Sequence, residues 1–358
     1  MKILLITDLY PVKSDEVTTP RTLYDFVQGW IRLGHSVKII KPNFILNSFI
    51  RKKPFYKTGW YEDVFNVNYW LPFCGDIRKK LKKFYDADFE PDIIIAHMPS
   101  GILFADKFGK PFSAGIHCSD ITVMTNPKYI FFRERMLKAL KNAEKIFCRS
   151  HILKRKLTSI FPEFENKTYT APSGIEERFI INDFTHEIQP DNLKIITCAN
   201  FKKRKNIDKV IYALKDISDI ELTIIGDGER KKELEKISNM PKFIGRLEHE
   251  EVLKYMRQND IFLLPSIDET FGMVYLEAMA SGCIPVCTTG EAVDGIIKSG
   301  ENGFTVKPKK EDIRKLIKQI KNTNKSELAQ IRQNALDTVK QYTQKACCEN
   351  YFKMLSEK

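Results

Sequence analysis

Two glutamates eight residues apart, Glu269 and Glu277, lie on either side of the start of a predicted helix. A short apolar strand ends at Pro265, and the helix begins near Phe271 and Gly272. The first N–H groups of a helix lack internal partners and carry the positive end of its dipole. Gly272 has no side chain to keep an anion away from these groups. A phosphate group can therefore bind there without a lysine.

Glu269 precedes the helix and Glu277 lies on its second turn, so both carboxylates can point at one ligand. A carboxylate beside a phosphate is unfavourable unless it accepts hydrogen bonds from hydroxyl groups. The arrangement therefore favours a phosphate with polyhydroxyl groups on either side. A nucleotide sugar, which consists of ribose, diphosphate and sugar, has this shape. The same residues are equally compatible with a helix that carries two surface glutamates.

This stretch resembles the E-x7-E motif of the retaining glycosyltransferases of family four, which runs P-S-x-x-E-x-F-G-x-x-x-x-E-A-M-A-x-G-x-P-V. The matching residues are Pro265, Ser266, Glu269, Phe271, Gly272, Glu277, Ala278, Met279, Ala280, Gly282, Pro285 and Val286. Segments 171–175, 225–228, 243–245 and 300–304 also resemble family motifs in order and spacing. The resemblance covers most of the chain and is strongest in its second half.

The resemblance implies a role for each matching residue of the donor site. It makes Glu277 the partner of the ribose hydroxyls and Glu269 a catalytic residue at the donor sugar. Lys205 falls where the family has a lysine that neutralises the diphosphate as the bond breaks. The nucleotide base is expected near Arg246. The backbone expected to hold the distal phosphate and the sugar is that of Phe271, Gly272 and Met273.

The segment 115–120, Gly-Ile-His-Cys-Ser-Asp, resembles the family's H-G-x-D at the end of a first-domain strand. The resemblance makes His117 a second catalytic residue, which reaches the donor sugar across the cleft. Asp120 is a possible site residue, and a role as N-cap of the next segment explains it as well. Cys118 replaces the glycine of the motif, and we do not expect it to be a nucleophile.

Two segments depart from the family pattern. Ala199-Asn200 replaces the Gly-Arg pair before the lysine, so Asn200 and Arg204 are possible donor-site residues, and Lys202, Lys203 or Arg204 could substitute for the missing arginine. The glycine-rich turn after the first strand is replaced by residues 13–21. There, Thr19 and Arg21 are possible polar contacts.

The elements that must position these residues alternate between strand and helix in both halves of the chain. Strands are predicted at 3–10, 37–41, 92–97, 113–117 and 146–149, and again at 193–199, 221–226, 242–245 and 261–265. This order predicts parallel sheets covered by helices on both faces, an α/β architecture. The resemblance implies the GT-B fold, in which two Rossmann-like, doubly wound domains face each other across a cleft.

We expect an acceptor-binding domain over residues 1–172 and a nucleotide-sugar-binding domain over residues 173–340. The break falls at the Pro-Ser-Gly of 172–174. The remaining residues, 341–358, are expected to form a C-terminal helix that packs on the first domain.

The positive charge of the chain is concentrated in its first half. Of the net charge of +12 over 358 residues, residues 1–175 carry +11, from 28 Lys and Arg against 17 Asp and Glu. Such an excess indicates an anionic partner. Within it, segment 44–83 mixes basic clusters with aromatic residues, which suits an anionic lipid surface or a nucleic-acid strand. A solvated loop and helix with core aromatics is the third interpretation.

Other features exclude whole classes of protein. No apolar run is long enough to span a membrane, and the N-terminal apolar stretch lacks the cleavage site of a secretory signal. The eight cysteines form no C-x-x-C pair, which is typical of free thiols in a reducing cytosol. We expect a cytoplasmic protein that is peripheral at the inner membrane face and has no nucleic-acid partner. The resemblance implies that no metal or other cofactor is needed.

The sequence therefore predicts a retaining hexosyltransferase. It would move a sugar from a nucleoside-diphosphate sugar to a glycan or lipid-linked acceptor, in the synthesis of lipopolysaccharide, O-antigen or capsule. One alternative is a sugar-nucleotide epimerase on the same fold, which would release free sugar and nucleotide without an acceptor. The other is a non-catalytic basic binding protein, whose function would survive the loss of Glu269.

Overall fold

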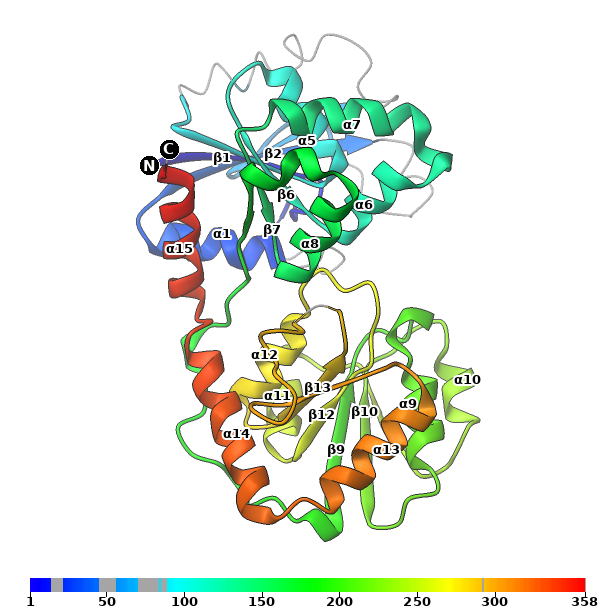
Figure 1. Ribbon diagram of the computed structural model, residues 1–358. Coiled ribbons are helices and arrows are strands. Elements are labelled where there is room, and N and C mark those ends of the chain that lie inside the picture. The colour runs from blue at the N-terminus through cyan, green and yellow to red at the C-terminus, as the bar shows by residue number, and fades with distance from the viewer. Residues whose placement is uncertain (14–21, 45–55, 70–83, 85–88, 292, 358) are drawn as a thin grey trace. The chain divides into compact units, whose positions relative to one another are not determined.

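The computed structural model describes residues 1–13, 22–44, 56–69, 84, 89–291 and 293–357. The chain forms two compact units (Figure 1). Unit 1 consists of Met1–Ser173 with Cys348–Lys358, and unit 2 of Gly174–Cys347. The sequence places the first boundary one residue earlier, at 172.

Unit 1 contains one largely parallel sheet. In the described part of the chain its strands are β1 (Lys2–Ile6), β2 (Ser36–Phe44), β3 (Gly59–Tyr61), β4 (Val64–Tyr69), β5 (Ile93–His97), β6 (Ser113–Ile116), β7 (Lys145–Cys148) and β8 (Thr168–Thr170). Their order is β3-β4-β2-β1-β5-β6-β7-β8, and only β3 and β4 pair antiparallel. After β2 and β4 the chain returns to the other side of β1, so the winding reverses between β1 and β5.

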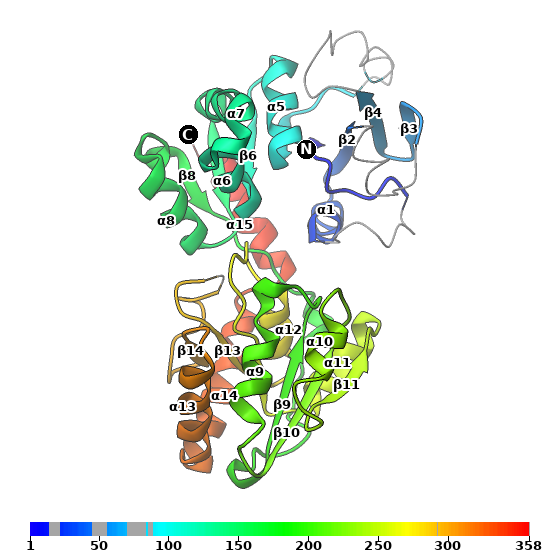
Figure 2. The same cartoon turned by 90° about the vertical axis from the view of Figure 1, so that its right-hand side faces the viewer.

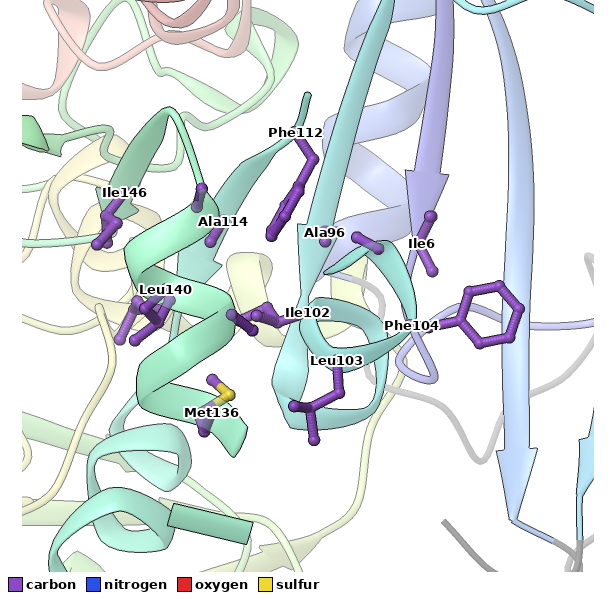
Figure 3. Packing of buried hydrophobic residues seen from close by; sticks show 14 of the residues in the cluster. Ile6, Ala96, Ile102, Leu103, Phe104, Phe112, Ala114, Met136, Leu140 and Ile146 are labelled. Carbon is purple, nitrogen blue, oxygen red and sulfur yellow. The ribbon is translucent and has the colours of Figure 1, made fainter. Parts of the chain in front are cut away.

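Successive residues of the central strand β1 point to opposite faces of this sheet, as the two-residue period of a strand requires. Leu4 and Ile6 belong to the cluster formed with α5 and α7, whereas Ile3 and Leu5 belong to the cluster formed with α1 and α15. Figure 3 shows the first cluster, with Ile102 of α5 and Leu140 of α7 among its members. The described helices of unit 1 are α1 (Thr22–Arg32), α5 (Met98–Phe108), α6 (Cys118–Thr125), α7 (Ile130–Asn142), α8 (His151–Ile160) and the part from Cys348 of α15 (Gln344–Ser356).

The last helix completes the core of unit 1. Tyr351 of α15 is 1% exposed and stacks on Trp30 of α1 with 5.8 Å between ring centroids. It also meets Phe147 of β7 at 4.5 Å. The sequence places a packing helix at this end of the chain, and these aromatic side chains form its contact.

Segment 44–83 contributes strands as well as loops. β4 extends the sheet beside β2, a pairing that the sequence analysis does not predict. Phe65 of β4 is fully buried, and Trp60 of β3 stacks on Phe84 at 5.5 Å between centroids. Phe65 therefore belongs to the core, and Trp60 packs against it. The basic clusters 51–53 and 78–83 lie outside the described residues.

Unit 2 contains a second sheet whose strand pairs are all parallel. In the described residues its strands are β9 (Leu193–Cys198), β10 (Ile220–Ile225), β11 (Lys242–Gly245), β12 (Ile261–Leu263), β13 (Ile284–Thr288) and β14 (Phe304–Val306). Their order is β11-β10-β9-β12-β13-β14. The chain moves outward from β9 to β11 and then returns to the other side of β9, so the winding reverses between β9 and β12.

Helices cover both faces of this sheet (Figure 2). Ile195 of β9 packs in the cluster with α9 and α13, and its neighbour Ile196 packs in the cluster with α11 and α12. The helices are α9 (Ile207–Leu214), α10 (Lys231–Glu235), α11 (His249–Arg257), α12 (Met273–Ala280), α13 (Lys310–Lys321) and α14 (Lys325–Lys340). Both units thus have the doubly wound α/β arrangement that the sequence predicts. None of the helices in the described ranges is long and apolar enough to cross a bilayer.

Candidate functional site

In unit 2, the predicted donor-site residues lie after β9, β11 and β12. In doubly wound sheets, ligands bind outside the carboxyl ends of the strands, where the winding reverses. That point lies here between β9 and β12, which pair in parallel. The loops that leave these two strands, 199–206 and 264–272, contain Lys205 and Glu269.

Hydrogen bonds to backbone carbonyl oxygens hold these two loops together. The Asn206 side-chain amide donates to the carbonyl oxygen of Pro265 at 2.7 Å, and the Ile267 N–H donates to the carbonyl oxygen of Arg204 at 2.9 Å. A third loop packs against them after β10, where a Cβ on Gly226 would lie 1.9 Å from the carbonyl oxygen of Ala199. Only glycine fits there, which fixes the close approach of the two strand ends.

Glu269 is the centre of a charged cluster on these loops. Its Oε1 atom accepts hydrogen bonds from the Ser266 hydroxyl at 2.6 Å and from Nη1 of Arg204 at 3.1 Å, and it pairs with Nζ of Lys205. The side chains of Glu269 and Lys205 are only 11% and 13% exposed. The cluster therefore joins two positive charges and one negative charge three residues before Gly272, the N-cap of α12.

The environment of Glu269 keeps its carboxylate ionised. Burial raises the pKa of Glu269, but the charges of Lys205 and Arg204 and the bonds from Lys205 and Ser266 outweigh it, so the pKa lies below the ordinary glutamate value. An ionised carboxylate accepts hydrogen bonds and cannot donate one. Glu269 is thus suited to bind hydroxyl groups.

Glu277 lies in the second turn of α12 and has a different partner. Its Oε1 atom lies 3.2 Å from Nε2 of His249, the first residue of α11. The thiol of Cys198 lies at the end of β9, and burial raises its pKa to about 12. The charge of Glu277 raises this pKa further, whereas the charge of Lys205 lowers it. Both charged side chains therefore lie near the carboxyl end of the central strand.

The other predicted residues of unit 2 divide between the helix start and the surface. Phe271 is buried, Gly272 has φ of 91°, and Met273 is the first residue of α12. Asn200 and Arg246 are exposed. Lys202 and Lys203 are exposed as well. Of these three neighbouring cations, the structure therefore places Arg204 beside Glu269.

In unit 1, His117 follows β6 and is the N-cap of α6. The Asp120 carboxylate accepts a hydrogen bond from the backbone N–H of His117 at 2.7 Å. Asp120 is therefore not the N-cap that the sequence leaves open, because the helix begins two residues earlier, and it stabilises the helix start from position N3. Its carboxyl group is fully buried, which raises its pKa to about 7 against the opposing bonds from His117 and Ser119. Thr19 and Arg21 lie outside the described residues.

Sequence reasoning misses three residues in these regions. His249 contacts Glu277, and His97 contacts His117 at 3.1 Å between Nδ1 and Nε2. Arg149, which follows β7, is 3% exposed and lies over the ring of Phe26. For His97 and Arg149 a signal exists, because each stands at the carboxyl end of a predicted strand.

Comparisons with known proteins agree with this architecture. Residues 179–338 match the model of the family "Glycosyl transferases group 1", and residues 19–179 match that of "Glycosyltransferase Family 4". An uncharacterised glycosyltransferase of Methanocaldococcus jannaschii is 26% identical over 72% of this chain and 71% of its own. The putative teichuronic acid biosynthesis glycosyltransferase TuaC of Bacillus subtilis is 25% identical over 86% of both chains.

A solved structure shows the same fold. HepE of Anabaena, in complex with UDP, superposes with a TM-score of 0.75 at 17% sequence identity, and the match covers 99% of this chain and 100% of that one. At this identity the likeness concerns the fold. The two doubly wound units are those of the GT-B architecture.

Proposed function

Because the chain belongs to the glycosyltransferases and has the GT-B fold, we propose that it transfers a hexose from a nucleoside-diphosphate sugar with retention of anomeric configuration. The observation that carries the proposal is the charged cluster of Ser266, Arg204, Lys205 and Glu269 at the winding reversal of unit 2. The complex of HepE with UDP supports a nucleotide as part of the donor.

In this proposal the loops of unit 2 bind the donor in two parts. The N-terminus of α12 and the cations of Lys205 and Arg204 hold the diphosphate and stabilise the charge that develops on it as the sugar leaves. The Glu269 carboxylate accepts hydrogen bonds from hydroxyls of the donor sugar. Glu277, held by His249, accepts them from the ribose.

The retaining course follows from the E-x7-E resemblance. The acceptor hydroxyl attacks from the face that the diphosphate leaves, and the departing phosphate takes the hydroxyl proton. His117 of unit 1 contacts the donor sugar in this proposal. We further propose that no divalent metal is required, because the two cations and the helix dipole supply the positive charge. Full activity in excess EDTA is expected, and loss of activity that Mg²⁺ restores would contradict this part.

The acceptor is proposed to be a glycan or lipid-linked molecule of surface polysaccharide synthesis. TuaC, named for teichuronic acid biosynthesis, supports a polysaccharide pathway. The +11 charge of residues 1–175 supports an anionic inner-membrane surface as a partner of unit 1 in a cytoplasmic protein. Replacing Arg78, Lys79, Lys80, Lys82 and Lys83 with Ala should reduce binding to vesicles with anionic lipids. Unchanged binding would contradict membrane contact through this segment.

Ligand-induced stabilisation tests the donor site. The purified protein is heated with UDP, GDP, ADP, CMP and their sugar conjugates, and a ligand at about 100 times its Kd adds about 2.7 kcal/mol to the free energy of unfolding. One nucleotide sugar should raise the Tm selectively. Glu277→Ala should abolish the shift, whereas Glu311→Ala, on the exposed face of α13, should retain it.

The products then separate the enzyme classes. Transfer of radiolabelled sugar to a membrane extract is expected, with loss of transfer in the Glu269→Gln variant. Release of free sugar and nucleotide without acceptor would favour the epimerase alternative. No Tm shift with any nucleotide sugar would contradict the proposal.

A further inference from the structure

Three adjacent strands of unit 1 bring polar residues to one edge of the sheet. His97 ends β5, His117 follows β6 and Arg149 follows β7, and these strands are consecutive neighbours. The family resemblance gives a role to His117 alone. The contact between the two histidines is a feature that the structure adds.

The ring of His97 makes a polar contact with the ring of His117. Nδ1 of His97 lies 3.1 Å from Nε2 of His117, and the two rings meet edge to face with 5.4 Å between centroids. His97 is 2% exposed, and its Nε2 atom is buried without a hydrogen-bond partner in the described residues. The polar contact of the His97 ring is thus directed at His117.

Gly115 of β6 provides the space for this ring. It stands opposite His97 in the register of β5 and β6. A Cβ atom at Gly115 would lie 2.0 Å from Cε1 and 2.2 Å from Nδ1 of His97, so any side chain there would displace the imidazole. The position of the His97 ring therefore depends on the absence of a side chain at Gly115.

Both rings are neutral at physiological pH. Burial, with added repulsion from Arg149, lowers the pKa of His117 to about 3. Burial, Arg149 and His117 lower the pKa of His97 well below its ordinary value. Each neutral imidazole has one N–H donor and one acceptor nitrogen, so the bond between the rings carries one proton and couples their tautomers: either Nδ1 of His97 donates to Nε2 of His117, or Nε2 of His117 donates to Nδ1 of His97.

We propose that His97 is a positioning residue that fixes the ring orientation of His117 and couples the tautomer of His117 to its own. The consequence for catalysis rests on the proposed function, in which His117 contacts the donor sugar. A His117 ring whose Nε2 is bonded to His97 offers a substrate hydroxyl its Nδ1 atom alone, whereas a free ring would offer both nitrogens. The tautomer itself is a property of unit 1 and can be measured without substrate.

Nuclear magnetic resonance of the full chain with ¹⁵N-labelled histidine tests the proposal at pH 7. Long-range ¹H–¹⁵N spectra distinguish the two tautomers, and His117→Asn identifies the His117 signals. The ratio of the two His117 tautomers in the native chain is the reference. His97→Leu should change this ratio, while His97→Asn should restore it because its amide lies near the place of Nδ1. An unchanged His117 spectrum in folded His97→Leu would overturn the proposal.

Gly115→Ala is the second variant, in case His97→Leu does not fold. It retains both histidines but displaces the His97 ring, so it should disturb the His117 spectrum in the same direction. Native His117 signals in the folded Gly115→Ala chain would likewise contradict the role of His97. Thermal unfolding of each variant establishes that the folded state is being observed.

Kinetics show whether the tautomer matters for transfer. His97→Leu should lower kcat between tenfold and a hundredfold, the range that misplacement of a reacting group produces. Nucleoside-diphosphate affinity should remain within twofold, because the proposed diphosphate ligands lie in unit 2. His97→Asn should recover most of kcat. If no variant transfers sugar, native chain included, the proposed function fails while the spectra still test the histidine pair.

Discussion

At the scale of the residue, the Glu269 carboxylate owes its properties to its partners. Two cations and one hydroxyl converge on its Oε1 atom, and they hold both its charge and its direction. An amide of the same shape would retain the volume of the side chain and lose the charge. A shorter carboxylate would retain the charge and withdraw from the partners.

Substitutions of Glu269 separate these two properties. Glu269→Gln should lower kcat/KM for transfer about ten- to a hundredfold, because a hydrogen bond to a charged group is worth about 1.5–3 kcal/mol. Glu269→Asp should lose activity too, since its carboxylate no longer reaches Lys205 and Arg204. Initial rates at varied nucleotide-sugar concentration measure both effects. Retention of activity by either variant would remove Glu269 from the site.

The native chain and Glu269→Gln also test the charge of Glu269, through the pH dependence of their stability. A carboxylate whose folded pKa is depressed contributes stability above its unfolded pKa, and this contribution is lost as the pH falls through the folded value. The difference in free energy of unfolding between the native chain and Glu269→Gln should therefore be constant from pH 8 to about 5. Below about pH 4 it should shift against the native chain. Urea unfolding at each pH measures it.

At the scale of the element, helix α6 begins with a buried acid. Asp120 accepts a hydrogen bond from the N–H of His117. It lies at the third position of the helix, where an acidic side chain stabilises the helix N-terminus. Burial raises its pKa to about 7, so the folded chain binds this proton more tightly than the unfolded chain does. The capping bond is retained in either protonation state, because an oxygen accepts it in both.

Asp120→Asn should therefore become more stable relative to the native chain as the pH rises. The native chain loses stability between about pH 4 and pH 7, as the unfolded state releases a proton that the folded state keeps, and the amide has no such loss. Asp120→Ala removes the acceptor and should cost about 1 kcal/mol. Urea unfolding between pH 4 and 8 measures both. A pH-independent difference for Asp120→Asn would mean that the carboxyl group is not buried as described.

At the scale of the whole molecule, the two ends of the chain meet in one core. Tyr351 of α15 packs on Trp30 and Phe147, which belong to the first 150 residues. The burial of its ring raises the pKa of the hydroxyl, which has no hydrogen-bond partner in the described part of the chain. Its contribution to stability therefore comes from the ring.

Two substitutions of Tyr351 separate the contribution of its ring to stability from that of its hydroxyl group. Tyr351→Ala should lower the free energy of unfolding by about 3–5 kcal/mol, as the loss of a buried aromatic ring does. Tyr351→Phe should be neutral or stabilise by up to about 1 kcal/mol, because it removes a buried polar group without a partner. Chemical denaturation compares them. A loss in Tyr351→Phe as large as that in Tyr351→Ala would contradict the absence of a partner.

The sequence by itself determined the repeated strand–helix order and the division near residue 172, and it predicts Glu269 and Glu277 as site residues, to which the family resemblance adds Lys205. These follow from local features, namely hydrophobic period, Pro and Gly at the boundary, and residue types at fixed spacing. The family resemblance could extend them to a fold because the same local features recur in the GT-B glycosyltransferases.

Only the tertiary structure decided which side chains meet. Arg204 reaches Glu269 while Lys202 and Lys203 face solvent, because the short turn Lys203–Lys205 sends neighbouring side chains in different directions. His97 meets His117 because β5 and β6 lie side by side and Gly115 leaves room for the His97 ring, although the two histidines are twenty positions apart. Such contacts depend on strand register and on missing side-chain volume, which local sequence patterns do not specify.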